Sequence, residues 1–121
     1  MGLDQSWLVE DENGEQQSFA YHRKFNALEG YMADIWNAIH SEPGEYQQFN
    51  CELLEITPSI LQDLEDTARN EGLEPTSGFF FGTAEKDEWY LQDMKELLEE
   101  VIPKAREYLE EGQTVYYTSW W

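Results

Sequence analysis

The clearest alternation of apolar and polar positions lies between residues 25 and 40. Six apolar side chains recur there at intervals of three, four, three, one and three, which is one face of a helix. They are Phe25, Leu28, Met32, Ile35, Trp36 and Ile39. Gly30 weakens the helix by about 1 kcal/mol relative to alanine, and Pro43 and Gly44 end it. The pattern predicts a helix with one face in the core.

A second helix is predicted after residue 57. Thr57 can accept a hydrogen bond from the helix start, and Pro58 suits the first helical position. Its apolar side is formed by Ile60, Leu61, Leu64 and Ala68. The stretch Asn70-Glu71-Gly72 ends it.

A third helix is predicted from Thr83 or Asp87 to Glu111, before Gly112. At about 100° per residue, its apolar side chains gather on one side. These are Tyr90, Met94, Leu97, Leu98, Val101, Ala105 and Tyr108. Six glutamates fall almost opposite, and we call them the carboxylate stripe: Glu85, Glu88, Glu96, Glu99, Glu107 and Glu110. Pro103 is expected to kink this helix or to remove one of its hydrogen bonds.

Four segments have the composition of strands. Residues 5–21 contain an Asn13-Gly14 turn signal, which favours a hairpin, although a polar loop fits as well. Residues 45–57 alternate like a strand with an irregularity near Leu53 and Leu54, and residues 79–81 are three phenylalanines between glycines. The last segment, TVYYTSWW, is rich in β-branched and aromatic residues and is expected to close the core.

The last segment is also predicted to have two different faces, because side chains alternate along a strand. One face carries Tyr116, Thr118 and Trp120, and the other carries Val115, Tyr117, Ser119 and Trp121. One face can pack in the core while the other meets solvent or a second copy of the chain.

These elements predict an α+β fold in which three helices pack on a small, mainly antiparallel sheet. The length of 121 residues fits one domain over residues 1–121, with residues 1–20 as an N-terminal hairpin or a loop extension.

The chain is strongly acidic, with 26 Asp and Glu against seven Lys and Arg, a formal charge of −19. The excess is spread along the chain, so it belongs to a folded body and not to a tail. Direct binding to nucleic acid needs a positively charged surface to contact the phosphates, so we exclude it. The N-terminus lacks the pattern of a signal peptide, no apolar run spans a bilayer, and a single cysteine suits a reducing cytoplasm. We therefore expect a cytoplasmic protein with no membrane partner.

Three stretches resemble a family of small, largely uncharacterised proteins encoded by tailed bacteriophages and prophages. They are YHRKFNALEGYM, GFFFGTAEKDEWY and VYYTSWW. The positions that match or nearly match are Tyr21, Arg23, Lys24, Asn26, Leu28, Phe79, Phe80, Phe81, Gly82, Asp87, Tyr90, Tyr116, Ser119 and Trp120. The chain departs from the family at Glu29, where the family has histidine, and at Tyr31, where it has tryptophan. The resemblance implies a phage origin and an α+β fold, but no established activity.

No group of residues suggests catalysis or a cofactor. His22, His40 and Cys51 are too few and too scattered for a zinc site, and residues 9–20 lack the first and last ligands of a calcium loop. We therefore predict no enzyme activity, no metal site and no cofactor. Arg23 and Lys24 form a small basic island, and an ion pair with the protein's own acidic surface is favoured over contact with an external anion.

The carboxylate stripe suggests a function in binding. Carboxylates three or four residues apart on a helix have Cβ atoms about 5–6 Å apart, comparable to the separation of successive phosphates along a DNA strand. Such a surface can occupy the basic groove of a nucleic-acid-binding protein. Together with the phage resemblance, this predicts an anti-defence inhibitor that acts as a DNA mimic on a host CRISPR or restriction protein. The carboxylate stripe would supply the negative electrostatic potential, and Trp120 or Trp121 would supply the aromatic anchor. The alternative is a self-associating structural module of a phage, such as a homodimer that pairs through its C-terminal strands or through its aromatic faces.

Overall fold

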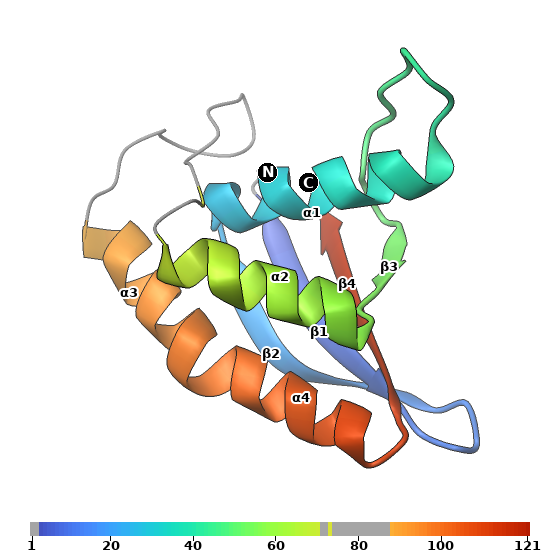
Figure 1. Cartoon of the computed structure of the whole chain (residues 1–121), viewed down its shortest axis with the longest axis vertical. Coiled ribbons are helices and arrows are strands. Elements are labelled where there is room, and N and C mark those ends of the chain that lie inside the picture. The colour runs from blue at the N-terminus through green and yellow to red at the C-terminus, as the bar shows by residue number, and fades with distance from the viewer. Residues whose placement is uncertain (1–2, 71–72, 74–87) are drawn as a thin grey trace.

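The computed structural model describes residues 3–70, residue 73 and residues 88–121. Its centre is a four-stranded sheet in which every neighbouring pair of strands is antiparallel. The strands are β1 (Asp4–Glu10), β2 (Gln16–Arg23), β3 (Leu53–Glu55) and β4 (Thr114–Trp120), in the spatial order β2-β1-β4-β3 (Figure 1).

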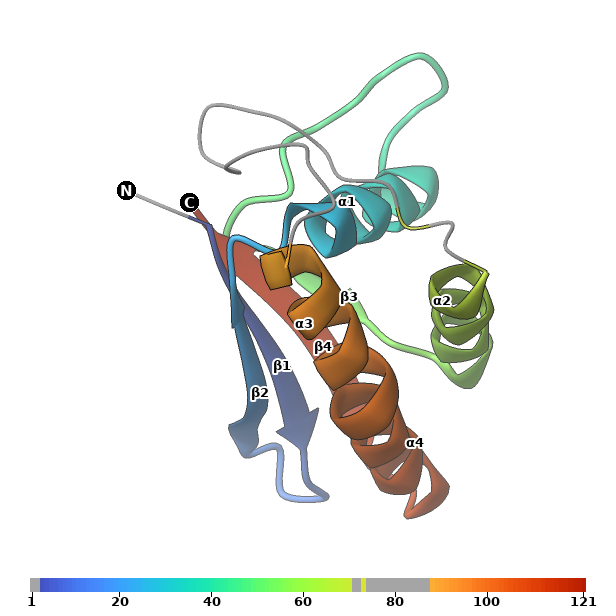
Figure 2. The same cartoon turned by 90° about the vertical axis from the view of Figure 1, so that its left-hand side faces the viewer.

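All the described helices lie on one face of this sheet, as the side view shows (Figure 2). They are α1 (Asn26–His40), α2 (Pro58–Arg69) and a long third helix made of α3 (Glu88–Glu96), the π-helical turn η1 (Leu97–Val101) and α4 (Ile102–Glu110). The predicted α+β class, with three helices on a small antiparallel sheet, is therefore confirmed. No helix in the described ranges has the length and apolarity needed to cross a membrane.

The N-terminal segment forms a hairpin whose first strand, β1, lies inside the sheet and whose second strand, β2, lies at its edge. Its turn contains Gly14 at φ +82°, a conformation that glycine adopts without strain. The Asp11 carboxylate accepts hydrogen bonds from the backbone N–H groups of Asn13 (2.9 Å) and Glu15 (3.0 Å), which fixes the turn. Because β1 pairs with both β2 and β4, residues 4–10 are a central strand and not an extension.

The first two helices begin and pack largely as their sequences predict. The Thr57 hydroxyl accepts a hydrogen bond from the N–H of Ile60 at 3.2 Å, with Pro58 at the first helical position. Four of the six core residues predicted for the first helix are buried: Phe25, directly before α1, and Leu28, Met32 and Trp36 within it. Ile39 is 59% exposed, so the buried face ends before the last turn of the helix.

The third helix contains a π turn that the sequence-based projection missed. The N–H of Ile102 donates to the carbonyl of Leu97, five residues earlier. The widened turn comes directly before Pro103, which has no N–H to donate and whose ring crowds the preceding turn. The predicted apolar face is kept across this turn, since Leu97, Val101 and Ala105 are buried, but it becomes wider. Ile102 is fully buried although the projection left it off the apolar side, and Leu98 is only partly buried.

The strand predicted over residues 45–57 is reduced to the three residues of β3. Cys51 has φ +62°, and its N–H donates to the carbonyl of Ser119 at 2.8 Å, so the chain joins the edge of β4 irregularly. Phe49 is nevertheless 2% exposed and stacks on Tyr117 with ring centroids 5.9 Å apart. The strand predicted at residues 79–81 and the predicted start of the third helix at Thr83 or Asp87 fall outside the described residues.

The C-terminal strand has the two predicted faces. Val115, Tyr117 and Ser119 are fully buried under the helices, whereas Tyr116 and Thr118 are partly exposed on the other face. The buried face packs against Trp7, whose ring centroid lies 5.6 Å from that of Tyr117. TVYYTSWW therefore closes the core with one face only.

Candidate interaction site

The carboxylate stripe lies along the third helix. Glu88, Glu99, Glu107 and Glu110 are exposed and Glu96 is half-buried, while Glu85 lies outside the described residues. The π turn separates the stripe into two parts, because a turn closed over five residues rotates the following positions about the helix axis. Glu88 and Glu96 come before this turn, and Glu107 and Glu110 come after it.

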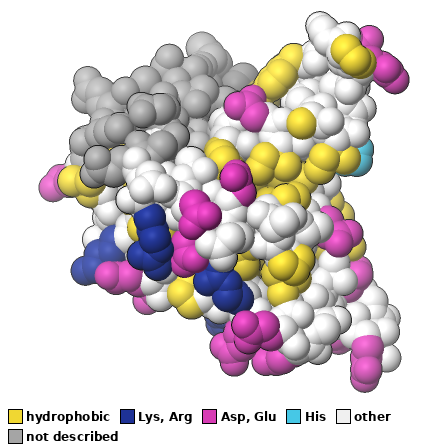
Figure 3. All heavy atoms as spheres, in the orientation of Figure 1, with side chains coloured by type: hydrophobic (Ala, Val, Ile, Leu, Met, Phe, Trp, Pro, Cys, Tyr) yellow, Lys and Arg dark blue, Asp and Glu magenta, His cyan; other side chains and the backbone are white. Residues whose placement is uncertain are grey.

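Basic side chains interrupt the acidic surface on the helix-covered side. Lys and Arg side chains lie among Asp and Glu side chains over α2 and α4 (Figure 3). Arg106 of α4 contacts the Glu65 carboxylate of α2 at 3.1 Å, and Arg69 contacts the same carboxylate at 3.2 Å. The hydrogen bond from Arg106 holds the pKa of Glu65 below its usual value. The negative field on this side is thus locally weakened where α2 meets α4.

The two C-terminal tryptophans, predicted together as anchors, lie on different sides of the sheet. Trp120 is 42% exposed and lies on the face without helices. The indole N–H of Trp121 points toward the core side, where it donates to the carbonyl of Phe49 (3.2 Å) and approaches the Glu29 carboxylate (3.4 Å). Trp120 is available to a partner, whereas Trp121 is half-buried and engaged within the protein.

The face of the sheet opposite the helices is uncovered in the described structure (Figure 2). Strand register assigns its residues: alternate positions of β1, β2, β3 and β4. They are Asp4, Ser6, Leu8, Glu10, Gln16, Ser18, Tyr21, Arg23, Leu53, Glu55, Thr114, Tyr116, Thr118 and Trp120. We call this set the open sheet face.

Arg23 and Lys24 do not form the ion pair predicted for them. Within the described ranges, neither side chain lies within 4.0 Å of a carboxylate oxygen. Arg23 stands opposite Asp4 in the register, but the Asp4 carboxylate accepts a hydrogen bond from the hydroxyl of Tyr21. Lys24 has φ +58°, and its backbone N–H donates to the carbonyl of Leu3 at 2.8 Å, so its role in the fold is that of a backbone turn.

A buried carboxylate, Glu29, is a feature that sequence reasoning missed. It is 1% exposed and accepts hydrogen bonds from the Tyr117 hydroxyl (2.8 Å) and the Ser119 hydroxyl (2.9 Å). Gln5 donates in turn to the Tyr117 hydroxyl at 2.8 Å, so the network joins α1 to β1 and β4. Burial raises the pKa of Glu29, and the hydrogen bonds to its charged form oppose that rise. A helical projection contains the signal, because Glu29 lies about 20° from Trp36 at the edge of the apolar face.

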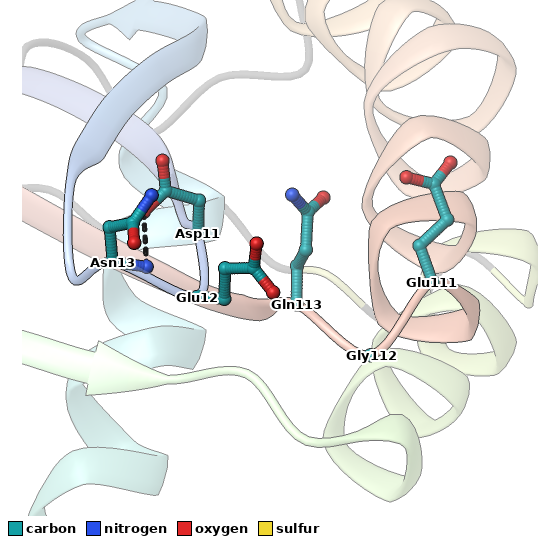
Figure 4. Close-up of a pocket in the computed structure, with 6 residues that line it drawn as sticks. All are labelled: Asp11, Glu12, Asn13, Glu111, Gly112 and Gln113. Atoms are coloured by element: carbon teal, nitrogen blue, oxygen red, sulfur yellow. Dashed lines mark hydrogen bonds between the residues drawn. The ribbon is translucent and has the colours of Figure 1, made fainter.

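A raised carboxyl pKa is one property of a catalytic acid, but Glu29 lies inside a packed core. A described surface hollow lies instead at the far end of the sheet, between the β1–β2 turn and the α4–β4 turn (Figure 4). It is lined by Asp11, Glu12, Asn13, Glu111, Gly112 and Gln113. The Asp11 carboxylate in this hollow already accepts two backbone hydrogen bonds within the β1–β2 turn. Among the described residues, no group of three or more His, Cys, Asp or Glu is placed to hold a metal ion. The hollow therefore supplies no catalytic arrangement.

His22 is a second buried titratable group. It is 3% exposed, and its Nε2 accepts a hydrogen bond from the Trp7 indole at 3.1 Å, so the imidazole is neutral with its proton on Nδ1. Within the part of the chain that the structure describes, Nδ1 has no hydrogen-bond partner. Burial lowers the pKa of His22 to about 4.

This histidine is expected to make the protein less stable in acid. Its folded pKa of about 4 lies below the unfolded value of 6.5, so the folded state binds fewer protons between these limits. The free energy of unfolding should fall by about 3 kcal/mol as the pH drops through this window. Urea denaturation of the wild type and His22→Gln across the window tests this, because the variant should lack that part of the pH dependence. If the free energy of unfolding changes with pH in the same way in the two proteins, the prediction is wrong.

Comparison of the chain with protein-family models, with curated proteins and with solved structures finds no significant match. The resemblance to small phage proteins therefore stays a prediction that depends on the three stretches given above. The surface features that bear on function are the exposed carboxylates and the open sheet face.

Proposed function

We propose that this protein is a non-catalytic binding protein encoded by a bacteriophage. It acts in the cytoplasm of the bacterial host, where it occupies the basic surface of a nucleic-acid-targeting defence protein of CRISPR or restriction type. Its acidic surface competes there with DNA or RNA.

The observation that carries this proposal is where the carboxylates lie in the fold. Four of the 26 acidic residues fall outside the described part, and of the other 22 only Glu29 is buried. The described part contains six Lys and Arg residues, and the ion pairs of Arg69 and Arg106 both go to Glu65. Most surface carboxylates therefore remain to act on a partner. Such a field attracts basic surfaces and repels nucleic acid.

The stripe and the aromatic anchor have separate tasks in this proposal. The stripe lies on the helical layer and Trp120 lies on the open sheet face, so one flat partner surface does not cover both. Charges at the rim of an interface mainly change the rate of association, whereas buried aromatic residues mainly determine dissociation. We therefore infer that the carboxylate stripe speeds association with the partner and that Trp120, the aromatic anchor, slows dissociation from it.

Reversing three stripe charges should slow association with the partner. The variant Glu99→Lys/Glu107→Lys/Glu110→Lys is compared with Glu42→Lys/Glu45→Lys/Glu52→Lys, which makes the same charge change in the exposed loop before β3. The tagged protein is used to capture its partner from host lysate, and association is then measured with the purified partner. We expect the stripe variant to associate about tenfold more slowly than wild type and the loop variant to be much less affected.

Competition identifies the class of partner in the same experiment. A basic nucleic-acid-binding complex that is released by added DNA or RNA, and held less well as salt is raised, supports mimicry. A partner that is not displaced by nucleic acid contradicts it. Equal slowing in the stripe and loop variants would show that only total charge matters and would remove the stripe from the proposal.

Self-association is a second candidate, favoured by the uncovered sheet face. Tyr21, Leu53 and Trp120 are all more than 40% exposed on it, and two copies packed face to face would bury them. Each copy carries a charge of −19, so such a dimer should strengthen as salt screens the repulsion. Light scattering at low and high salt distinguishes this behaviour from capture of a basic partner, which salt weakens.

A further inference from the structure

We propose that the open sheet face binds arginine side chains of a basic protein partner, through three aromatic rings that each lie beside a carboxylate. The inference rests on the proposed function and deepens it, because it names the surface that provides affinity and the side chain that the surface selects.

The open sheet face concentrates exposed aromatic and aliphatic surface. Of the six large apolar side chains that are exposed among the described residues, three lie here: Tyr21 (51%), Leu53 (43%) and Trp120 (42%). Leu8 and Tyr116 lie opposite each other on β1 and β4 in the next row of the register and are partly buried. An apolar centre with a polar rim is the usual anatomy of a protein interface.

Each aromatic ring on this face lies next to a carboxylate. The hydroxyl of Tyr21 donates to Asp4, and Trp120 stands directly opposite Asp4 on the other side of β1. Residues opposite each other in an antiparallel pair have Cβ atoms about 4.5–5.5 Å apart, so the indole and this carboxylate are neighbours.

The third ring, Tyr116, lies between two carboxylates. Glu55 of β3 is directly opposite it, and Glu10 of β1 lies close by on the other side. Burial, with the added repulsion of these two carboxylates, raises the pKa of the Tyr116 hydroxyl. The ring and both negative groups therefore share one place on the surface.

A ring beside a carboxylate suits a guanidinium group better than an ammonium group. Guanidinium is planar and weakly hydrated, so it can stack on an aromatic face while its N–H groups bind the carboxylate edge-on. Lysine is a compact, strongly hydrated charge and gains less from the ring. Two such places on one face, at Asp4 and at Tyr116, favour an arginine-rich segment. Once one arginine is bound, the second binds at a high effective concentration because both belong to the same chain.

Two other occupants fit the charges less well. Bases of single-stranded nucleic acid also stack on aromatic rings, but their phosphates would meet Asp4, Glu10 and Glu55. A second copy of the chain would bring the same carboxylates against this face, and each chain carries a net charge of −19. Arg23 is the one basic residue on the open face of the four described strands, and it stands opposite Asp4 at one edge of that face.

The test is calorimetric titration of the full chain with two peptides of equal length and charge, nona-arginine and nona-lysine. We expect nona-arginine to bind about tenfold more tightly, which is the scale of desolvated cation–π contacts. Tyr21→Ala/Trp120→Ala should reduce nona-arginine affinity about tenfold or more and abolish the preference for arginine. Both side chains are substantially exposed, and circular dichroism confirms that the variant is folded.

Tyr46 provides the matched control. It is also exposed, at 66%, and its hydroxyl donates to the Asp34 carboxylate at 3.0 Å, but it lies on the loop after α1, away from the open sheet face. Tyr46→Ala should therefore leave both affinities nearly unchanged. A second variant, Glu10→Gln/Glu55→Gln, should weaken nona-arginine binding without removing any ring.

Several results would overturn the inference. Equal affinity for the two peptides, no binding of either, or unchanged selectivity in Tyr21→Ala/Trp120→Ala would each do so, as would tighter binding of oligo-dT on this face. Lysate capture separates this failure from failure of the proposed function. If Tyr21→Ala/Trp120→Ala still captures a nucleic-acid-binding complex with wild-type affinity, the function stands and the surface is wrong. If arginine selectivity holds but no such complex is captured, the surface stands and the function is wrong.

Discussion

Replacing Trp7 by alanine should lower the free energy of unfolding by about 3–5 kcal/mol. Trp7 is fully buried on the central strand β1, with its ring packed edge-on against Tyr117. Its removal leaves a large cavity between the sheet and the helices, and it also takes away the donor that contacts Nε2 of His22 at 3.1 Å. Since small domains unfold at a cost of about 5–15 kcal/mol in all, this single change should remove much of the stability.

Trp120→Ala is the matched control, because it is the same substitution in the same sheet. Trp120 lies on the open face and is 42% exposed, so less apolar area is lost and no closed cavity forms. Urea denaturation of both variants at neutral pH measures the difference. A loss of equal size in the two proteins would mean that the sheet buries both faces, and the open sheet face would then not exist in solution.

The sequence predicts best what depends on neighbouring residues. The cap at Thr57 followed by Pro58 is a local signal, and so is the alternation that buries Tyr117 and exposes Trp120. The third helix was predicted with a disturbance at Pro103, and its predicted apolar residues Val101 and Ala105 are buried, but the projection left out Ile102, which packs in the core beside a π turn. A proline predicts a disturbance, but the choice between a kink, a lost hydrogen bond and a widened turn depends on how Ile102 packs in the core.

The candidate site depends on long-range pairing and was only partly predictable. The exposed glutamates of the third helix follow from its periodicity, and Trp120 follows from its strand. That Asp4 lies between Tyr21 and Trp120 follows only from the order β2-β1-β4-β3, which joins residues from both ends of the chain. Strand order and register are set by packing of the whole sheet, so local composition does not determine them.

Replacing Glu29 by alanine is the second large effect that we expect. The substitution leaves the hydroxyls of Tyr117 and Ser119 buried without the acceptor that now receives them at 2.8 and 2.9 Å. An unsatisfied buried polar group costs about 1–3 kcal/mol, so the loss should reach about 2–4 kcal/mol. Glu29→Gln keeps an oxygen acceptor in nearly the same volume and should lose much less. Urea denaturation of the three proteins at neutral pH measures both changes.

The glutamine variant also tests the charge state, because Glu29 and His22 act in opposite directions. Burial raises the folded pKa of Glu29, so the folded state binds its proton more readily than the unfolded state. Wild-type stability should therefore include a contribution that decreases as pH rises from the unfolded pKa through the raised folded one. Glu29→Gln lacks this contribution. His22 contributes in the opposite direction, because its part of the stability rises with pH above about 4, and His22→Gln lacks that part. If Glu29→Gln follows the wild-type pH curve throughout, the carboxylate titrates alike in both states and the buried network does not perturb it.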